Sequence, residues 1–268
     1  MDSDHEVSWF DSHCHLYDES DPVTIIRDAV DQNVRGFIVV GTDLVTSLKS
    51  YEIAKSVRDE VEEITLGLAV GVHPHSASEG IEGLEELIAT IQSESTNLLV
   101  GVGECGFDFY YNNSPKADQE RVFRCQIELA ASLDLALIVH TRDAWHETFD
   151  VLDRFGSNCR VLIHCFTGSV KELSECIERG FTVSFSGIAT FPKAEEIHEA
   201  VRRSCDGQFL IETDSPFLAP VPLRGKKNSP KNVAIVGREI ARLRDESELH
   251  LAQSTRNAAL SMFRFAPK

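Results

Sequence analysis

Six side chains suited to binding divalent metal ions are spread along this 268-residue sequence. His13 and His15 are separated by one residue, so in an extended strand both imidazoles point to the same side and Cys14 points to the other. The remaining four are Glu104, His140, His164 and Asp214. Four imidazoles and two carboxylates exceed the needs of one tetrahedral zinc ion, so we expect two metal ions bridged by a carboxylate and a water molecule.

Short apolar runs alternate with segments of helical periodicity from one end of the sequence to the other, which is typical of repeated βα units. The runs that we expect to form strands are Val7–Asp11, Gly36–Val40, Ile64–Val70, Leu98–Gly103, Leu135–His140, Arg160–His164, Thr182–Ser186 and Gln208–Glu212. This alternation over 268 residues predicts a single-domain α/β fold for residues 1–268, a (β/α)8 TIM-like barrel. A doubly wound open sheet is the alternative.

The metal-competent side chains fall at the carboxyl ends of different predicted strands. Glu104 comes at the end of the fourth strand, His140 and His164 end the next two, and Asp214 follows the eighth. In a barrel these ends converge on one mouth. A single histidine there is more often a structural residue, and a single aspartate is often a helix cap. Because all six positions agree in register, we favour a metal centre.

Composition and charge limit the class of protein. The chain has 26 Lys and Arg against 43 Asp and Glu, a net charge of −17, and an ordinary globular content of 42% hydrophobic residues. We expect no secretory signal and no membrane span, because no apolar stretch approaches roughly 20 residues. The 7 cysteines form no CxxC pair, which favours a reducing, cytoplasmic location. No obligate protein partner is evident.

The segments that carry these side chains resemble the TatD family of metal-dependent hydrolases. The matching segments are Phe10–Leu16, Gly71–His75, Gly103–Tyr110, Ile138–Asp143, Ile163–Gly168, Ser186–Gly187, Glu212–Pro220 and Arg224–Asn228. The resemblance extends from about Trp9 to Phe263. Cys105 and Phe107 replace the usual aliphatic residues, which touches no proposed ligand but bears on the shape of the pocket near Asp108.

The resemblance implies a TIM-like barrel of the amidohydrolase type that holds two divalent ions and hydrolyses phosphodiesters, commonly as a deoxyribonuclease. It also implies a division of the ligands: His13, His15 and Asp214 on one ion, His140 and His164 on the other, and Glu104 between them. Imidazoles suit Zn²⁺, Mn²⁺ or iron, whereas phosphodiester chemistry commonly uses Mg²⁺, so the identity of the metal stays open. Asp214 is positioned to accept the proton of an activated water molecule.

Three further residues are candidates for contacts with an anionic substrate. His73, at the end of the third predicted strand, could donate to a phosphate oxygen or be a structural residue of a His-Pro turn. Arg142 is expected at the start of a helix, where free N–H groups also attract anions. Arg224 belongs with Lys226 and Lys227 to a basic cluster in a loop that either lines a nucleic-acid groove or is solvated.

The other residues near these motifs are expected to have supporting or structural roles. Asp108, in a predicted glycine-flanked loop, and Glu212 would orient a ligand or a substrate group. Cys105 and Cys165 are expected to turn toward the helices as small buried hydrophobic residues. We interpret the remaining histidines as surface or packing residues: His5, His75, His146, His198 and His250.

Three functions compete for this set of residues. The leading hypothesis is a 3′–5′ DNA exonuclease with DNA, or RNA, as its substrate. A deacylase or amidohydrolase acting on an ester or amide, such as aminoacyl-tRNA, would use the same metal site. The third is a metal-binding scaffold without catalytic activity, which the complete ligand set disfavours.

Overall fold

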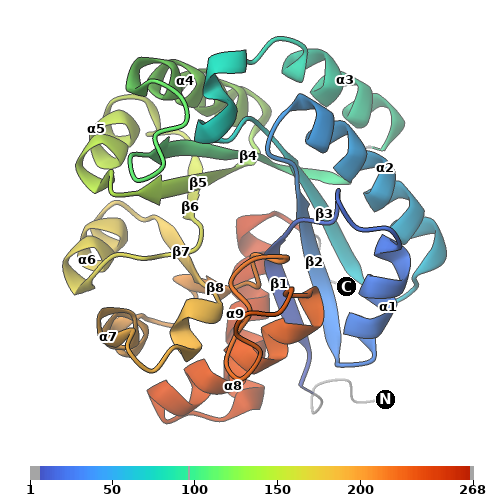
Figure 1. Ribbon diagram of the computed structural model, residues 1–268, viewed down its shortest axis with the longest axis vertical. Helices are drawn as coiled ribbons and strands as arrows, with labels where there is room; N and C mark the ends of the chain where they lie inside the picture. Colours follow the sequence, from blue (N-terminus) through green and yellow to red (C-terminus); the bar gives the residue numbers. More distant parts are fainter. Residues whose placement is uncertain (1–6, 96, 266–268) are drawn as a thin grey trace.

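The computed structural model describes residues 7–95 and 97–265. Eight parallel strands form one sheet in sequence order, and it curls into a nearly closed barrel surrounded by helices (Figure 1). The strands are β1 (Trp9–Cys14), β2 (Val34–Val40), β3 (Thr65–Val70), β4 (Leu99–Asp108), β5 (Ala136–Arg142), β6 (Arg160–Ile163), β7 (Thr182–Phe185) and β8 (Phe209–Ile211). The predicted (β/α)8 barrel is therefore confirmed, and the open-sheet alternative is wrong.

Helices follow the strands and cover the outside of the barrel (Figure 1). The α-helices are α1 (Pro22–Val30), α2 (Leu44–Glu60), α3 (Leu84–Glu94), α4 (Lys116–Leu133), α5 (Trp145–Phe155), α6 (Val170–Glu178), α7 (Glu195–Arg203), α8 (Val233–Arg244) and α9 (Glu248–Met262). Short 3₁₀ helices are η1 (Pro74–Glu79), η2 (Gly187–Thr190) and η3 (Pro230–Asn232). Among the helices of the described residues, none combines the length and hydrophobicity needed to cross a membrane.

The core has two large parts, because successive strand residues face opposite sides of the sheet, and a small third cluster of Val72, Ala77 and Val122. One part fills the space between the sheet and the outer helices. The other fills the barrel interior, where Phe10 packs with Ile38 and Ile138, and where Met262 at the end of α9 and the following Phe263 enter from the end where the strands begin. The interior is thus packed at one end, which leaves the carboxyl ends of the strands for polar side chains.

The barrel is closed by polar contacts between β1 and the segment after β8. The buried Asp11 carboxylate accepts hydrogen bonds from the Thr213 backbone N–H at 2.8 Å and from its hydroxyl at 2.6 Å. The Asp214 N–H donates to the His13 carbonyl at 3.0 Å, and the His15 N–H donates to the Ser215 carbonyl at 2.8 Å. These contacts fix the two metal-competent segments of β1 and β8 relative to each other.

Several element boundaries differ from those expected from sequence. β4 continues to Asp108 and β5 to Arg142, because Cys105, Gly106, Phe107 and Asp108 pair in register with residues 139 to 142. Glu104 and His140 therefore lie within strands, and Asp108 lies in a strand instead of a loop. The expectation that Arg142 begins a helix is wrong, because α5 begins only at Trp145. Polar and glycine residues within a buried strand look like a loop in the sequence, because the sequence does not show the neighbouring strand that pairs with them.

We predict that Thr213→Val weakens the closure between β1 and β8. The substitution keeps the shape of the side chain but removes the hydroxyl that donates to Asp11 and accepts from the Ser215 N–H. Leaving buried polar groups unsatisfied costs about 1–3 kcal/mol. Urea unfolding should show this loss in the free energy of unfolding, whereas Thr90→Val on the exposed face of α3 should change it by less than about 0.5 kcal/mol. Equal effects of the two substitutions would refute the role of Asp11.

Candidate metal centre

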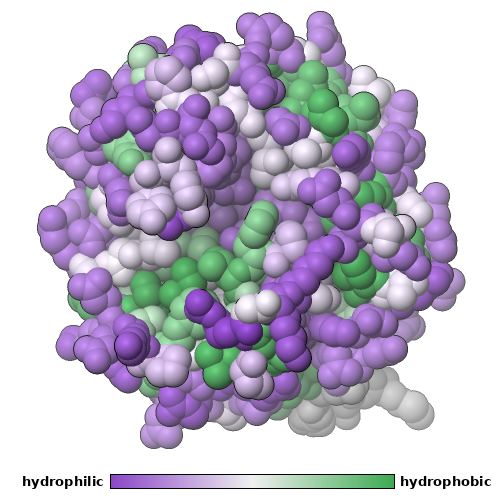
Figure 2. All heavy atoms as spheres, viewed as in Figure 1, coloured by the Kyte–Doolittle hydropathy of each residue, from purple (hydrophilic) through white to green (hydrophobic). Residues whose placement is uncertain are grey.

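A cavity of about 760 Å³ opens at the carboxyl ends of the strands. His15, Glu104, His140, His164 and Asp214 line it, and His13 lies fully buried beneath it. The barrel mouth faces the viewer in Figure 2, where mostly hydrophilic residues surround it and hydrophobic residues gather near β8 and the segment that follows. The structure therefore brings all six sequence-predicted metal ligands to one place.

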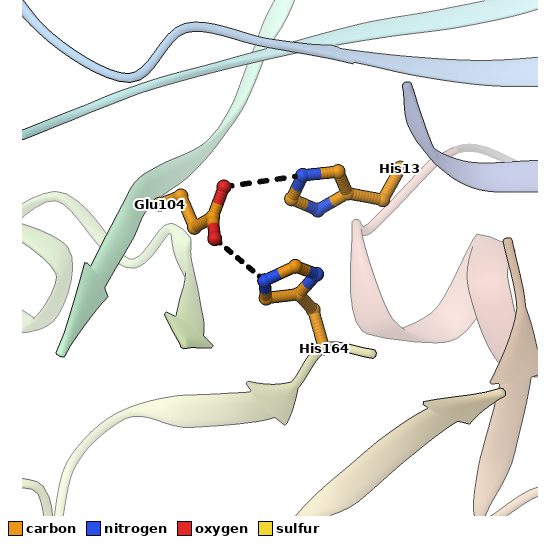
Figure 3. Close-up of side chains that lie close together, drawn as sticks. All are labelled: His13, Glu104 and His164. Atoms are coloured by element: carbon orange, nitrogen blue, oxygen red, sulfur yellow. Dashed lines mark hydrogen bonds and ion pairs between the residues drawn. The ribbon is translucent and has the colours of Figure 1, made fainter. Parts of the chain in front are cut away.

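Glu104 contacts several members of this group, and its two oxygens point toward His13 and His164 in Figure 3. One carboxylate oxygen, Oε1, lies 2.7 Å from His164 Nε2 and 3.0 Å from His140 Nδ1. The other oxygen, Oε2, lies 3.4 Å from His13 Nε2 and 3.8 Å from His15 Nε2. The two oxygens thus face different imidazoles, as a carboxylate must if it is to bridge two ions.

Asp214 completes the set on the side of β1. Its Oδ1 lies 3.4 Å from His15 Nε2 and 4.0 Å from His13 Nε2. The residue adopts a left-handed backbone conformation with φ 53°, which aspartate tolerates better than most residues. The turn that begins there is held by the preceding Thr213, which Asp11 binds. The position of this carboxylate is therefore set by the polar contacts that close the barrel.

The lone pairs at this centre repel one another unless a proton or a metal cation lies between them. The Nδ1 of His15 is 2.9 Å from the Val40 carbonyl, and only a protonated nitrogen can donate to a carbonyl. In its neutral form the ring therefore carries the lone pair on Nε2, which faces the carboxylate oxygens of Asp214 and Glu104. Imidazole nitrogens and carboxylate oxygens are common ligands of divalent metal ions. The donor set therefore fits such ions.

The pKa shifts show that the centre favours positive charge. Burial by itself lowers the pKa of His15, but Asp214 and Glu104 raise it above the ordinary value. Burial by itself raises the pKa of Glu104, but His164 and His73 hold it well below its usual range. Burial lowers the pKa of His73 to about 4, so this ring is neutral at pH 7. An anionic carboxylate and a neutral ring are the forms that bind metal.

Two buried carboxylates lie close to the outer edges of the histidine rings. Glu212 Oε1 lies 3.4 Å from His164 Nδ1, and Glu212 Oε2 accepts a hydrogen bond from Ser184. Asp108 Oδ2 lies 3.3 Å from His140 Nε2 and 2.9 Å from His75 Nε2. Contacts of this kind fix the orientation of a metal-binding ring and make it a better donor. This arrangement supports the expectation that Asp108 and Glu212 orient ligands.

Histidines 73 and 75 lie closer to the centre than the sequence indicated. His73 Nε2 is 3.3 Å from Glu104 Oε1, and His73, Glu104 and His140 form a group of ligand atoms within 4.8 Å of one another. The interpretation of His75 as a surface or packing residue is wrong, because its ring contacts Asp108 and lines the cavity. His73 and His75 are separated by one residue, as His13 and His15 are. This spacing is the sequence feature that indicates a second pair of histidines at the site.

The two arginine candidates have different positions. Arg142 lines the cavity. Arg224 is not among the cavity-lining residues, and its guanidinium stacks on the Phe191 ring at 3.7 Å. The neighbouring Lys227 forms an ion pair with Glu19 at 2.7 Å. The basic loop is thus partly engaged with the protein itself, because a partly buried aromatic and a partly buried acidic side chain lie within its reach.

The remaining sequence-predicted residues lie as follows. Cys105 is buried in the outer core, as expected. The expectation for Cys165 is wrong, because it follows the end of β6 in a left-handed conformation and lines the cavity. His198 and His250 lie outside the centre, the first on the Ala189 carbonyl and the second on Asp206. The exposed His146 does not line the cavity, and His5 lies outside the described residues.

The chain is similar to known proteins in sequence and in fold. A family model described as "TatD related DNase" matches residues 10–264. The chain is 36% identical to the Bacillus subtilis protein named "Uncharacterized metal-dependent hydrolase YabD", over 95% of this chain and 98% of that protein. It is 31% identical to the Yersinia pseudotuberculosis protein named "3'-5' ssDNA/RNA exonuclease TatD", over 90% of this chain and 92% of that protein. The crystal structure of the TatD homologue YJJV from Escherichia coli shares the fold, with a TM-score of 0.85 and 22% identity over 96% of this chain and 98% of that chain.

We predict that Glu104→Gln removes most of the stabilisation that divalent metal gives to the folded protein. At a free Mn²⁺ or Zn²⁺ concentration of about 100 times Kd, the wild-type free energy of unfolding should rise by about 2.7 kcal/mol per site. A neutral amide cannot supply a negative oxygen to both pairs of imidazoles, so the variant should gain less than about half of this. Unfolding curves of chelator-treated protein, with and without added metal, measure the difference. Glu199→Gln, at a side chain of α7 that is 42% exposed, is the control, and an equal gain in all three proteins would contradict the assignment.

A second prediction concerns the carboxylate behind His164. Glu212→Gln should weaken metal binding by about 10- to 100-fold, because the ring loses the charge that orients it. Competition with a metal-binding dye measures the affinity, and circular dichroism checks that the fold is retained. Affinity within about twofold of wild type would show that Glu212 only fills space.

Proposed function

The chain belongs to the TatD-related DNase family of metal-dependent hydrolases, and from this premise we propose that it cleaves phosphodiester bonds of DNA or RNA as a 3′–5′ exonuclease with two divalent ions. The observation that carries the proposal is the position of Glu104, whose two oxygens face two separate groups of imidazoles. Family membership makes the protein an enzyme that acts on ester bonds. The substrate and the number of ions are our proposal.

The proposed ligands divide into two groups around Glu104. His13, His15 and Asp214 would hold one ion, since one nitrogen or oxygen of each lies within 4.8 Å of the others. His140 and His164 would hold the second, since both face the same oxygen of Glu104. His73 faces this oxygen too, so it is available to the second ion or to a substrate phosphate. Mg²⁺, Mn²⁺ and Zn²⁺ are the candidates, given this mixture of nitrogen and oxygen donors.

The chemistry requires a nucleophile at neutral pH and compensation of the phosphate charge. Divalent ions supply both when bound, because they lower the pKa of water toward 7 and stabilise the entering and leaving oxygens. Asp214 is our candidate general base, since burial alone raises its pKa but the facing His15 holds the pKa below its usual range, so the group is an anion that can accept a proton. Its side chain is 14% exposed and borders the cavity, so a water molecule can reach it.

Other residues of the chain would bind and orient. Glu212 and Asp108 hold the rings of His164 and His140 from behind. Arg142 carries a positive charge at the wall of the cavity, where a phosphate next to the cleaved one could lie. The net charge of −17 opposes the approach of a polyanion, so local cations must compensate for it. The exonuclease name of the Yersinia relative supports the choice of substrate and direction.

We predict that the purified protein shortens end-labelled single-stranded DNA from its 3′ end when divalent metal is present and not when a chelator is added. Glu104→Ala and His140→Ala should abolish cleavage without unfolding the protein, because the metal site is lost. Asp214→Asn should lower kcat by at least about 100-fold, the contribution expected of a general base. The exposed variant Glu199→Gln should keep wild-type activity.

The assay also separates the rival hydrolase. Turnover of an aminoacyl ester by the metal-loaded protein, without release of nucleotides from DNA or RNA, would overturn the nuclease proposal and favour a deacylase. Full nuclease activity of Glu104→Ala at low added metal would overturn the two-ion model. Bound metal without turnover of either substrate would identify a scaffold without catalytic activity.

A further inference from the structure

Two exposed aromatic side chains stand on different walls of the cavity. Tyr111, beyond the end of β4, is 55% exposed, and Phe217, in the segment after β8, is 56% exposed. Both line the cavity. Large apolar rings at a polar mouth cost solvation free energy, because they leave apolar area in water. Such rings are typical of a site where a flat apolar group binds.

Tyr111 is held in place by the network behind the metal centre. Its ring packs edge-on against His75 with centroids 5.4 Å apart, and His75 contacts the Asp108 carboxylate that also faces His140. The Tyr111 N–H donates to the other oxygen of Asp108 at 2.8 Å. The Arg142 guanidinium lies 4.8 Å from the Tyr111 ring centroid and 4.1 Å from that of Tyr110. The ring is therefore a fixed part of the wall formed by β4 and β5.

Phe217 is held by the opposite group of ligands. Its ring centroid is 6.1 Å from that of His15, and its N–H donates to the carbonyl of Asp214 at 2.8 Å. Asn228 fixes the same turn by donating to the Phe217 carbonyl at 2.7 Å. Each aromatic ring is thus attached to one half of the proposed metal centre, and Glu104 lies between the halves.

Positive charge, by contrast, is scarce around the cavity. Arg142 is the one arginine among the lining residues that the structure describes, which include no lysine. Its guanidinium is already stacked on two tyrosines. Arg224 and Lys227 of the basic loop have partners within the protein. A strand of nucleic acid would therefore find few cations for its backbone phosphates, so its affinity must come from another part of the nucleotide.

We propose that Tyr111 and Phe217 stack the nucleobases on the two sides of the cleaved phosphate, and that base stacking more than backbone charge selects an unpaired strand. This inference rests on the proposed nuclease function. Stacking of a base on an aromatic side chain contributes roughly 5- to 150-fold in affinity and tolerates any sequence, because every base has a π face. Bases within a duplex have both faces covered, so they cannot use these rings. The specificity for a free single-stranded end thus follows from the two walls.

The test compares a normal oligonucleotide with one that lacks bases next to the cleaved phosphate. The second substrate carries tetrahydrofuran abasic nucleotides at its last two 3′ positions. We expect wild-type kcat/KM to be at least about tenfold higher for the normal strand, mainly through KM. In Tyr111→Ala and Phe217→Ala, the ratio of kcat/KM for the normal strand to kcat/KM for the abasic strand should fall toward one. Tyr111→Trp, which keeps an aromatic ring, should keep the wild-type ratio. Val45→Ala, exposed on α2 away from the cavity, should keep the wild-type preference.

The possible outcomes are distinguishable. If wild type cleaves both strands equally well, the stacking inference is overturned while the nuclease proposal stands. If the alanine variants lose activity on both strands to the same extent, with the preference unchanged, the rings are structural and the inference is again overturned. If metal-loaded wild type cleaves neither strand, the nuclease proposal fails and the inference fails with it. The slope of log KM against log salt concentration reports the number of phosphate contacts. A slope near 0.7, the value for one contact with a single strand, supports the inference, whereas a slope above about 3 contradicts it.

Discussion

A buried carboxylate among imidazoles is the interaction on which the rest of this structure depends. Glu104 is 4% exposed, and its charge would be costly inside a barrel without the nitrogen atoms that surround it. Those nitrogen atoms are in turn useful only if each ring presents a proton to the carboxylate or a lone pair to a bound cation. The centre is therefore balanced electrically as a unit, and each member depends on the positions of the others.

This balance explains why so many polar residues are buried around the barrel mouth. Asp11 and Thr213 fix the turn that carries Asp214, and Glu212 and Asp108 fix the outer edges of two rings. None of these four lies among the proposed ligands. They restrict the ligands to a narrow range of positions, which metal affinity requires, and polar contacts can do so at the strand ends because the apolar core fills the other end of the barrel.

The acidity of the chain is compatible with its proposed nucleic-acid substrate if the attraction is confined to the mouth of the barrel. A surface with a net charge of −17 does not attract nucleic acid, so attraction has to be local. Bound divalent ions would provide it at one phosphate, and exposed aromatic rings would bind the neutral part of the nucleotide. In this view the negative charge of the whole molecule limits the number of nucleotides that bind. The side chains at the mouth of the barrel determine which groups of those nucleotides are contacted.

The sequence alone determined the barrel, the metal-competent residues and the family. Strand periodicity and motif spacing are local properties, so they can be recognised from the order of the residues. It could not determine that β4 and β5 continue past Glu104 and His140, since this extension depends on pairing between residues more than thirty positions apart. His75 and Cys165 were misplaced for a similar reason, because a contact with Asp108 and a left-handed turn after β6 are tertiary features. Only the folded chain decided which oxygen of Glu104 faces which ring, because side-chain direction is set by all the neighbours together.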